Sequence, residues 1–347
     1  MSEIVRAALA TAVEGGSLSR EQAHEAMGAI MDGQATPSQL AALLVALRMR
    51  GETTAELAGF ATAMRERVRH VEAPAGTIDV VGTGGDARRT FNISTAAALV
   101  AAAAGVPVAK HGNRAITSAS GSRDVLEALG VTVEQEPSEA AASLREEGFA
   151  FLFAPGYHPA MKHAGPTRGE IGIRTAFNLL GPLTNPAGVR RQVLGVADGA
   201  AAPRLAEVAR ELGTDRTLVI HGDRIDELPL DGSGVLYDVG PTGIERSEVG
   251  QAALAACGLA GAPIEALSGG TPAENAALIS ALLSGSRGPQ RDVVLLNAAA
   301  ALLVAGRAAD LAAGVSLAAA TIDSGAARVK LERLQARHAR GSAGVPA

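Results

Sequence analysis

Hydrophobic residues recur with two different periods along this chain. From residue 1 to about 70 the spacing is helical throughout, and one predicted helix carries its apolar face at Leu40, Leu43, Leu44 and Leu47. From Ile78 onward, short apolar runs alternate with helical stretches. Such alternation is typical of an α/β domain with a largely parallel sheet. The sequence therefore predicts an α/β fold: a small all-helical domain, residues 1–70, followed by a larger α/β domain.

Three helix starts in the first seventy residues carry a capping box, in which Ser or Thr precedes Gln or Glu by three positions. The pairs are Ser19 with Gln22, Thr36 with Gln39, and Thr53 with Glu56. Gly33 and Gly51 end two of these helices. The pattern alone leaves two interpretations open for the apolar surface of this unit: a lid over a single core, or a dimer contact.

Seven apolar runs in the second part are candidate strands, at 78–82, 106–110, 131–135, 149–154, 191–197, 217–221 and 235–239. Late helices are expected at 272–284, 289–306 and 309–324. The predicted α/β catalytic domain comprises residues 71–164 and 189–336, after a linker that contains Pro74 and Gly76. The polar tail, 337–347, is expected to fray.

Residues 155–188 interrupt the alternation of strands and helices. The stretch is rich in polar residues and proline, which is typical of a surface loop. Its second half, FNLLGPLTNPA, is too apolar for a free loop. We therefore expect residues 165–188 to form an excursion that returns to the helical domain.

Composition narrows the class of protein. The chain has 347 residues, is 47% hydrophobic and 2% aromatic, and contains no run of eighteen apolar residues, so we expect no membrane span and no membrane partner. Cys257 is the only cysteine, which excludes an intrachain disulfide and suits a cytoplasmic location. The net charge of −5 argues against a nucleic-acid partner.

Two predicted neighbouring strands each end in a polar, glycine-bearing loop that leads into a helix. The first reads IDVVGTGGD and then TFNIS, and the second reads VPVAKHGNR and then SGS. Glycine lets a backbone approach an oxyanion closely, and a helix N-terminus offers free N–H groups with partial positive charge. A single GTGG turn is common in ordinary βα loops. The cluster of Lys, His, Asn and Arg directly after a buried strand is not required for packing, and it favours a site for two phosphates of one ligand.

The order and spacing of these motifs resemble those of anthranilate phosphoribosyltransferases. The shared segments are GTGGD at 82–86, TFNIS at 90–94, KHGNR at 110–114, SGS at 120–122, HPAMKH at 158–163 and RGEIGIRT at 168–175. The resemblance covers nearly the whole chain. It implies transfer of phosphoribose from 5-phosphoribosyl 1-diphosphate to the amino group of anthranilate, with release of pyrophosphate, in tryptophan biosynthesis. It also implies a homodimer formed through the helical domain.

The resemblance and the chemistry of the side chains together assign candidates for the phosphoribosyl diphosphate site. The first loop and its helix supply Gly82, Gly85, Asp86, Thr90, Asn92, Ile93, Ser94 and Thr95. The second loop and its helix supply Lys110, His111, Gly112, Asn113, Arg114, Ala115, Ile116, Thr117, Ser118 and Ser122. Lys110 is expected to place a point charge on phosphate. No covalent nucleophile is expected, because the reaction is a displacement between two oriented substrates.

The resemblance further implies Mg²⁺ as cofactor and a separate set of residues for anthranilate. An Asp-Glu pair in a loop is by itself most often a solvated turn, but the family uses such a pair for Mg²⁺, which assigns Asp226 and Glu227, with the Ser94 hydroxyl as a third ligand. The anthranilate candidates are Gly82, His111, Asn113, His158 and Arg168. Arg168 is expected to hold the carboxylate, because a guanidinium group matches it with two parallel hydrogen bonds.

Four positions depart from the family's pattern. Ala87 and Arg224 stand where glycine is usual, and Ala119 stands where Lys or Arg is common. Arg123 replaces a small residue and is expected to restore the phosphate-binding charge missing at Ala119.

Two rival functions fit this sequence less well. A pyrimidine nucleoside phosphorylase is disfavoured by the KHGNR loop and by the block around Arg168. A nucleic-acid-binding relative without enzyme activity is disfavoured by the acidic net charge and by the intact candidates for Mg²⁺ and anthranilate.

Overall fold

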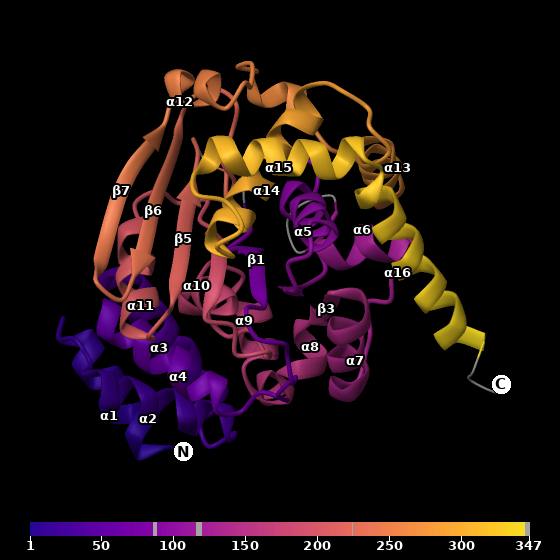
Figure 1. Ribbon diagram of the computed structural model, residues 1–347. Coiled ribbons are helices and arrows are strands. Elements are labelled where there is room, and N and C mark those ends of the chain that lie inside the picture. Colours follow the sequence, from indigo (N-terminus) through magenta and orange to yellow (C-terminus); the bar gives the residue numbers. More distant parts are fainter. Residues whose placement is uncertain (86–88, 116–119, 224, 344–347) are drawn as a thin grey trace.

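The structure, a computed structural model, describes residues 1–85, 89–115, 120–223 and 225–343. A helical domain lies below one end of a twisted sheet, and further helices cover the sheet (Figure 1). The helical domain begins with α1 (Glu3–Val13), α2 (Arg20–Met31), α3 (Pro37–Arg50) and α4 (Thr54–Arg65). The three predicted capping boxes are present at the starts of α2, α3 and α4, so the helix boundaries here follow from local sequence.

Seven strands of the described chain form one sheet in the order β3-β2-β1-β4-β5-β6-β7. Their bounds are β1 (Ile78–Gly82), β2 (Val108–Gly112), β3 (Phe149–Phe153), β4 (Arg191–Gly195), β5 (Arg216–His221), β6 (Gly234–Gly240) and β7 (Gly243–Val249). The first five pair in parallel, and β6 and β7 are antiparallel. The predicted fold class, a small helical domain with a larger, mostly parallel α/β domain, is confirmed.

The helices that follow β1 cover both faces of the sheet and the ends of its strands. Their bounds are α5 (Ile93–Ala103), α6 (Ser122–Ala128), α7 (Pro137–Glu147), α8 (Ala154–Tyr157), α9 (Gly165–Ile171), α10 (Ala176–Leu180), α11 (Ala202–Glu211), α12 (Gln251–Ala256), α13 (Pro272–Leu283), α14 (Pro289–Val304), α15 (Leu311–Asp323) and α16 (Ala326–Ala343). Short 3₁₀ turns are η1 (Pro159–His163), η2 (Gly181–Leu183) and η3 (Ile264–Leu267). The three late helices predicted from the sequence are confirmed as α13, α14 and α15.

Two hydrophobic cores lie on opposite faces of the sheet. On one face α5, α14, α15 and α16 pack over Val80 and Val193. On the other face α11 and the helical domain pack over Val81 and Leu194, which are the neighbours of those two residues along β1 and β4. This alternation of faces is the expected consequence of the two-residue period of a strand.

The strand predicted at 131–135 is wrong. Val131 and Val133 are buried, but the segment is an extended connection between α6 and α7 and pairs with no strand in the described chain. Its apolar side chains pack in the same core as Leu331 and Leu334 of α16. Alternating burial therefore arises here from packing on one side against a helix and not from a sheet.

Two other expectations at the edges of the fold also need correction. The edge strand β7 was missed because its middle residues are polar and exposed, which hides the hydrophobic alternation. The tail predicted to fray from residue 337 is helical as far as Ala343. There the Arg337 side chain forms an ion pair with Glu146 of α7.

Residues 164–183 join the core of the helical domain. Phe177, Leu180 and Leu183 are buried together with the leucines of α3, and the Arg65 Nε of α4 donates a hydrogen bond to the Leu183 carbonyl at 2.7 Å. The apolar face of α3 is thus covered within the chain itself. This removes the sequence argument that the α3 face forms a dimer contact, and the homodimer stays a prediction from the resemblance.

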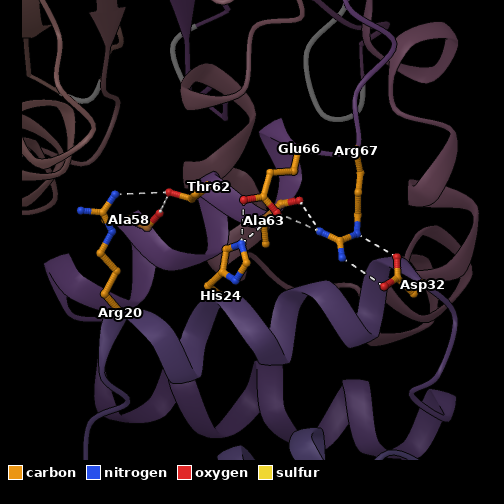
Figure 2. A network of polar contacts seen from close by, with 8 residues as sticks. All are labelled: Arg20, His24, Asp32, Ala58, Thr62, Ala63, Glu66 and Arg67. Carbon is orange, nitrogen blue, oxygen red and sulfur yellow. Dashed lines mark hydrogen bonds and ion pairs between the residues drawn. The ribbon is translucent and has the colours of Figure 1, made fainter.

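A polar network joins α2 and α4 at the surface of the helical domain (Figure 2). The His24 Nε2 lies 2.9 Å from a Glu66 carboxylate oxygen, and the Arg67 Nε donates to the Asp32 Oδ1 at 2.8 Å. Arg67 also donates to the Ala63 carbonyl of α4. These groups lie at the solvent edge of two tightly packed helices.

The helices that can be described include none with the length and hydrophobicity needed to cross a membrane.

Candidate functional site

A cavity of about 300 Å³ lies where β1 and β2 end and α5 begins. It brings together most of the residues assigned to phosphoribosyl diphosphate and Mg²⁺, although they come from segments more than a hundred positions apart. The predicted residues that line it are Gly82, Gly85, Thr90, Asn92, Ile93, Ser94, Thr95, Lys110, His111, Gly112, Asn113, Arg114, Ala115, Ser122, Asp226 and Glu227. Asp86, Ile116, Thr117 and Ser118 lie outside the described residues.

Asp226 reaches this cavity because two glycines leave room for it. A Cβ on Gly82 would overlap the Asp226 carboxylate, and a Cβ on Gly195 would overlap its backbone carbonyl. The Gly84 N–H donates to the Asp226 Oδ2 at 2.8 Å. Gly82 and Gly195 are paired residues at the ends of β1 and β4, so the sheet itself forms the place for the carboxylate.

The second carboxylate of the pair is held by the helix that starts the site. The Ser94 N–H, in the first turn of α5, donates to the Glu227 Oε1 at 3.0 Å. Burial raises the pKa of Asp226, while the Gly84 hydrogen bond and the charges of Arg174 and Lys110 oppose that shift. The first glycine loop thus holds Asp226, and the N-terminus of α5 holds Glu227.

Lys110 lies in the wall of the cavity and is only 2% exposed. Its ammonium group donates to the Val80 carbonyl at 2.6 Å and to the Ser94 Oγ at 3.4 Å. Burial lowers the pKa of Lys110, while the nearby carboxylates of Asp79, Glu227 and Asp226 act in the opposite direction. The Lys110 ammonium group is therefore buried near the carboxylates of Asp79, Glu227 and Asp226, and it is not exposed to solvent.

Asp79 of β1 connects β1 with β2 and with Asn185 through its carboxylate. Its two carboxylate oxygens accept from the His111 N–H at 3.1 Å and from the Asn185 Nδ2 at 2.7 Å. Asn185 also donates to the Ala109 carbonyl at 2.8 Å, so it connects the end of the 165–188 excursion to both strands. Complete burial raises the pKa of Asp79 to about 6, although the Lys110 charge opposes the shift.

Arg123 does not supply the phosphate-binding charge expected of it. Its guanidinium donates to Glu127 at 2.8 Å and to Glu134 at 2.7 Å, and it lies 5.1 Å from the centre of the Phe153 ring. It is absent from the lining of the cavity. Two carboxylates already neutralise it. Arg114, which does line the cavity, lies over the same Phe153 ring at 5.8 Å.

A second cavity, of about 480 Å³, lies between the helical domain and the end of β2. Four of the five residues assigned to anthranilate line it: His111, Asn113, His158 and Arg168. The fifth, Gly82, lines only the first cavity. Apolar side chains of Met64, Met161 and Phe177 complete the wall. A mainly apolar cavity with a few polar groups suits a small aromatic ligand.

Arg168 is held above the Phe177 ring, with its guanidinium carbon 4.8 Å from the ring centre. Burial lowers the pKa of Arg168. No carboxylate among the described residues forms an ion pair with this side chain. A half-buried guanidinium at the edge of an apolar cavity is suited to bind an anionic ligand.

His111 and His158 form a buried pair at this cavity. Their Nε2 atoms lie 3.2 Å apart, so one ring donates and the other accepts. Burial lowers the pKa of His111 to about 3 and that of His158 to about 4. Both rings are therefore neutral at pH 7. His111 and Asn113 line both cavities, which meet at these two residues.

Comparison with known protein families identifies the two domains. Residues 75–328 match a family described as "Glycosyl transferase family, a/b domain", and residues 6–68 match "Glycosyl transferase family, helical bundle domain". The anthranilate phosphoribosyltransferase of Chloroflexus aggregans is 53% identical over 332 residues, which are 95% of this chain and 97% of that protein. This chain belongs to the anthranilate phosphoribosyltransferase family.

Solved structures of the family share the fold over the full length. The anthranilate phosphoribosyltransferase of Thermus thermophilus is 47% identical with a TM-score of 0.89, covering 96% of this chain and 99% of that one. The Saccharomyces cerevisiae enzyme in complex with phosphoribosyl diphosphate and Mg is 28% identical with a TM-score of 0.87, covering 98% and 99%. The same yeast enzyme has also been solved with 4-fluoroanthranilate.

Several residues that line the first cavity were not assigned to it from the sequence. They include Arg174 and Asn178, from the 165–188 excursion, and Thr83 and Gly84 of the first loop. The Arg174 side chain donates to the Gly85 carbonyl at 3.4 Å. The signal was available, because Arg174 lies in the RGEIGIRT segment that supported the resemblance.

Proposed function

We propose that the first cavity binds phosphoribosyl diphosphate with Mg²⁺ and that the second binds anthranilate. The reaction is transfer of phosphoribose from 5-phosphoribosyl 1-diphosphate to the anthranilate amino group, which gives N-(5-phosphoribosyl)anthranilate and pyrophosphate in tryptophan biosynthesis. This assignment of one substrate to each cavity is supported by the fact that the two cavities meet at His111 and Asn113. A sugar carbon in one cavity and an amine in the other would face each other there.

The phosphoribosyl diphosphate site combines backbone donors with two arginines. The glycine loop of 82–85 and the N-terminus of α5 supply N–H groups, which suit phosphate oxygens. Arg114, which follows β2, and Arg174, from the 165–188 excursion, add positive charge. Asp86, Ile116, Thr117 and Ser118 are retained in this proposal from the family motifs.

The residues assigned to Mg²⁺ suit that ion by their donor atoms. Asp226, Glu227 and Ser94 all line the first cavity and have oxygen atoms to offer, and Mg²⁺ prefers oxygen ligands that it shares with phosphates and water. Desolvation raises the pKa of Asp226, so a cation would offset the cost of its charged form. When bound, Mg²⁺ would neutralise charge that develops on the leaving pyrophosphate.

The protein's own contribution to the reaction is orientation. Arg168 would bind the anthranilate carboxylate and leave the amine near Asn113. The Asn113 Oδ1 already accepts from the Arg114 N–H at 2.8 Å, and a carbonyl oxygen has a second lone pair for the amine. Orientation of two substrates can lower a barrier by ~7–11 kcal/mol. No covalent intermediate is required.

The resemblance to the family also suggests the oligomeric state and the cellular location of the protein. We propose a homodimer through the helical domain in the cytoplasm. Exposed apolar side chains support a contact on the outer side of α1 and α3, where Val13 is 70% and Met49 84% exposed. Sedimentation at micromolar protein should give about twice the chain mass of 34.9 kDa. A mass near that of one chain would contradict the dimer.

One assay tests the proposed function. Anthranilate fluorescence should fall when the protein is mixed with phosphoribosyl diphosphate and Mg²⁺. Phosphorolysis of thymidine in place of this reaction would identify a nucleoside phosphorylase. A shift of single-stranded DNA in a gel, without loss of anthranilate, would identify a nucleic-acid-binding protein.

A further inference from the structure

A chain of three hydrogen bonds connects α13 with both loops of the first cavity. The Gly270 N–H donates to the Asn275 Oδ1 at 2.8 Å, and the Asn275 Nδ2 donates to the Asn92 Oδ1 at 2.9 Å. The Asn92 Nδ2 then donates to the Ser120 carbonyl at 3.0 Å. Asn275 is 2% exposed and lies 183 positions from Asn92. It lines neither cavity.

The two backbone groups that end this series of hydrogen bonds, the Gly270 N–H and the Ser120 carbonyl, determine the orientation of both side-chain amides. A backbone N–H only donates, so the Asn275 atom that faces Gly270 is its oxygen. The Asn275 NH₂ group then faces Asn92 and requires an acceptor there. Consequently the Asn92 NH₂ group faces Ser120, whose backbone carbonyl only accepts. One arrangement satisfies all three bonds, and rotating either amide by 180° breaks two of them.

In this arrangement the Asn92 side chain is turned toward Asn275 and does not cap α5. Asparagine is among the strongest N-cap residues, because its oxygen accepts from an N–H group in the first turn. Asn92 occupies the N-cap position of α5, yet its side chain forms no capping hydrogen bond. The oxygen is engaged by Asn275 instead. The Ser94 N–H of that first turn points to Glu227, inside the proposed substrate site.

The segment before α13 supports the same loop through its backbone. The Phe91 N–H donates to the Leu267 carbonyl at 3.0 Å, and the Gly269 N–H donates to the Arg89 carbonyl at 2.9 Å. Thr90 and Ser268 form an antiparallel bridge. A Cβ on Gly269 would lie 2.6 Å from the Phe91 Cα, so only glycine permits this approach.

We propose that Asn275 is a positioning residue for the phosphoribosyl diphosphate site, acting through Asn92. It holds the Asn92 side chain away from the first turn of α5, where the Ser94 N–H donates to Glu227, and it joins the first loop to the Ser120 segment of the second. The proposal rests on the assignment of the first cavity to phosphoribosyl diphosphate. Asn275 itself touches no substrate.

The test compares Asn275→Ala and the nearly isosteric Asn275→Asp with the unchanged protein. Both variants should raise KM for phosphoribosyl diphosphate about 3- to 10-fold, the range for loss of one neutral hydrogen bond. The anthranilate KM at saturating phosphoribosyl diphosphate should change less than about twofold. Asn275→Asp should be affected at least as strongly, because its second oxygen would face the Asn92 oxygen.

The matched control is Glu274→Ala, one position earlier on the same helix. Glu274 closes the capping box of α13 with Thr271 and forms no hydrogen bond with Asn275 or Asn92. Its loss should lower the Tm by about 1–3 °C and leave both KM values unchanged. This separates damage to α13 from damage to the link with Asn92.

A double variant decides whether Asn275 acts through Asn92. In an Asn92→Ala background, Asn275→Ala should have no further effect on KM for phosphoribosyl diphosphate. Full additivity, or an unchanged KM in both Asn275 single variants, would overturn the proposal. If the unchanged protein consumes no anthranilate, the proposed function fails instead, and the two failures are distinct. If Asn275→Asp does not fold, Asn275→Ala provides the same test without a buried charge.

Discussion

Two polar networks in this molecule use similar side chains in opposite surroundings. The network between α2 and α4 is made of charged groups at the surface, where the side chains of Arg67 and Asp32 are 27% and 46% exposed (Figure 2). The polar groups of β1 and β2 beside the first cavity are buried, and they include Asp79 and Lys110. Both join segments that are distant in sequence.

Solvent decides what each network can do. In the surface network the hydrogen bond from Arg67 lowers the pKa of Asp32, and water screens much of that interaction. Among the buried groups, desolvation outweighs the attraction between opposite charges, because it raises the pKa of Asp79 and lowers the pKa of Lys110. The buried network can therefore position chemical groups, whereas the surface network contributes little beyond local stability.

The largest expected effect comes from the carboxylates of the first cavity. Replacing Asp226 with Asn and Glu227 with Gln should lower turnover about 100-fold or more, since the charge that holds Mg²⁺ is lost. The Tm should not fall strongly, because burial already disfavours the charged form of Asp226. Steady-state kinetics and thermal unfolding measure the two effects. Undiminished turnover of the unchanged protein in excess chelator would contradict the magnesium assignment.

Arg168 tests the second cavity. Arg168→Ala should raise the anthranilate KM about 10- to 150-fold, because a charged hydrogen bond contributes ~1.5–3 kcal/mol. Turnover number and KM for phosphoribosyl diphosphate should change only a few-fold, since the contact exists in both ground and transition states.

The surface network supplies the control for Arg168. Arg67→Ala removes a guanidinium of similar size from the α2–α4 network, and both KM values should remain as they were. If Arg168→Ala weakened only phosphoribosyl diphosphate, Arg168 would be a phosphate ligand and the anthranilate cavity would be misassigned.

The buried histidine pair should make stability depend on pH. The pKa values of His111 and His158 are about 3 and about 4, below the ordinary value of 6.5. Between pH 6.5 and about 4, the unfolded chain binds protons at these histidines that the folded protein does not bind. The free energy of unfolding is therefore highest above pH 6.5, as far as these two groups are concerned, and it decreases as the pH falls toward 4.

The variant His158→Gln isolates this effect. Between pH 6.5 and 4.5, its free energy of unfolding should fall less steeply than that of the unchanged protein, by about 1 kcal/mol per pH unit. Denaturant titration at several pH values gives the slopes. Asp79 has a raised pKa and acts in the opposite direction over this range, but it is present in both proteins and cancels in the difference. Equal slopes would show that the pKa of His158 is the same in the folded and unfolded protein.

The smallest effect is expected in the surface network. Asp32→Ala should lower the free energy of unfolding by about 0–1 kcal/mol, and the difference should shrink in high salt. Urea titration in low and high salt measures it. A loss of several kcal/mol that persists in salt would show that this network is as important as the buried one.

Elements with strong local signals could be predicted from the sequence. Capping boxes placed the starts of α2, α3 and α4, and the two glycine loops with KHGNR indicated the family and the edge of the sheet that carries the site. Local signals also misled where a tertiary partner set the pattern. The segment 131–135 alternates because it packs beneath α16, and β7 lacks alternation because it is a polar edge.

The contacts between side chains from distant segments depend on the folded structure. Arg123 carries the charge that a phosphate needs, but Glu127 and Glu134 neutralise it. Lys110 points into the wall, and Asn275 reaches Asn92 across 183 positions. Periodicity reports which face of an element is buried. It contains no information about the partner that a buried polar group finds, because that partner depends on how elements distant in sequence pack together.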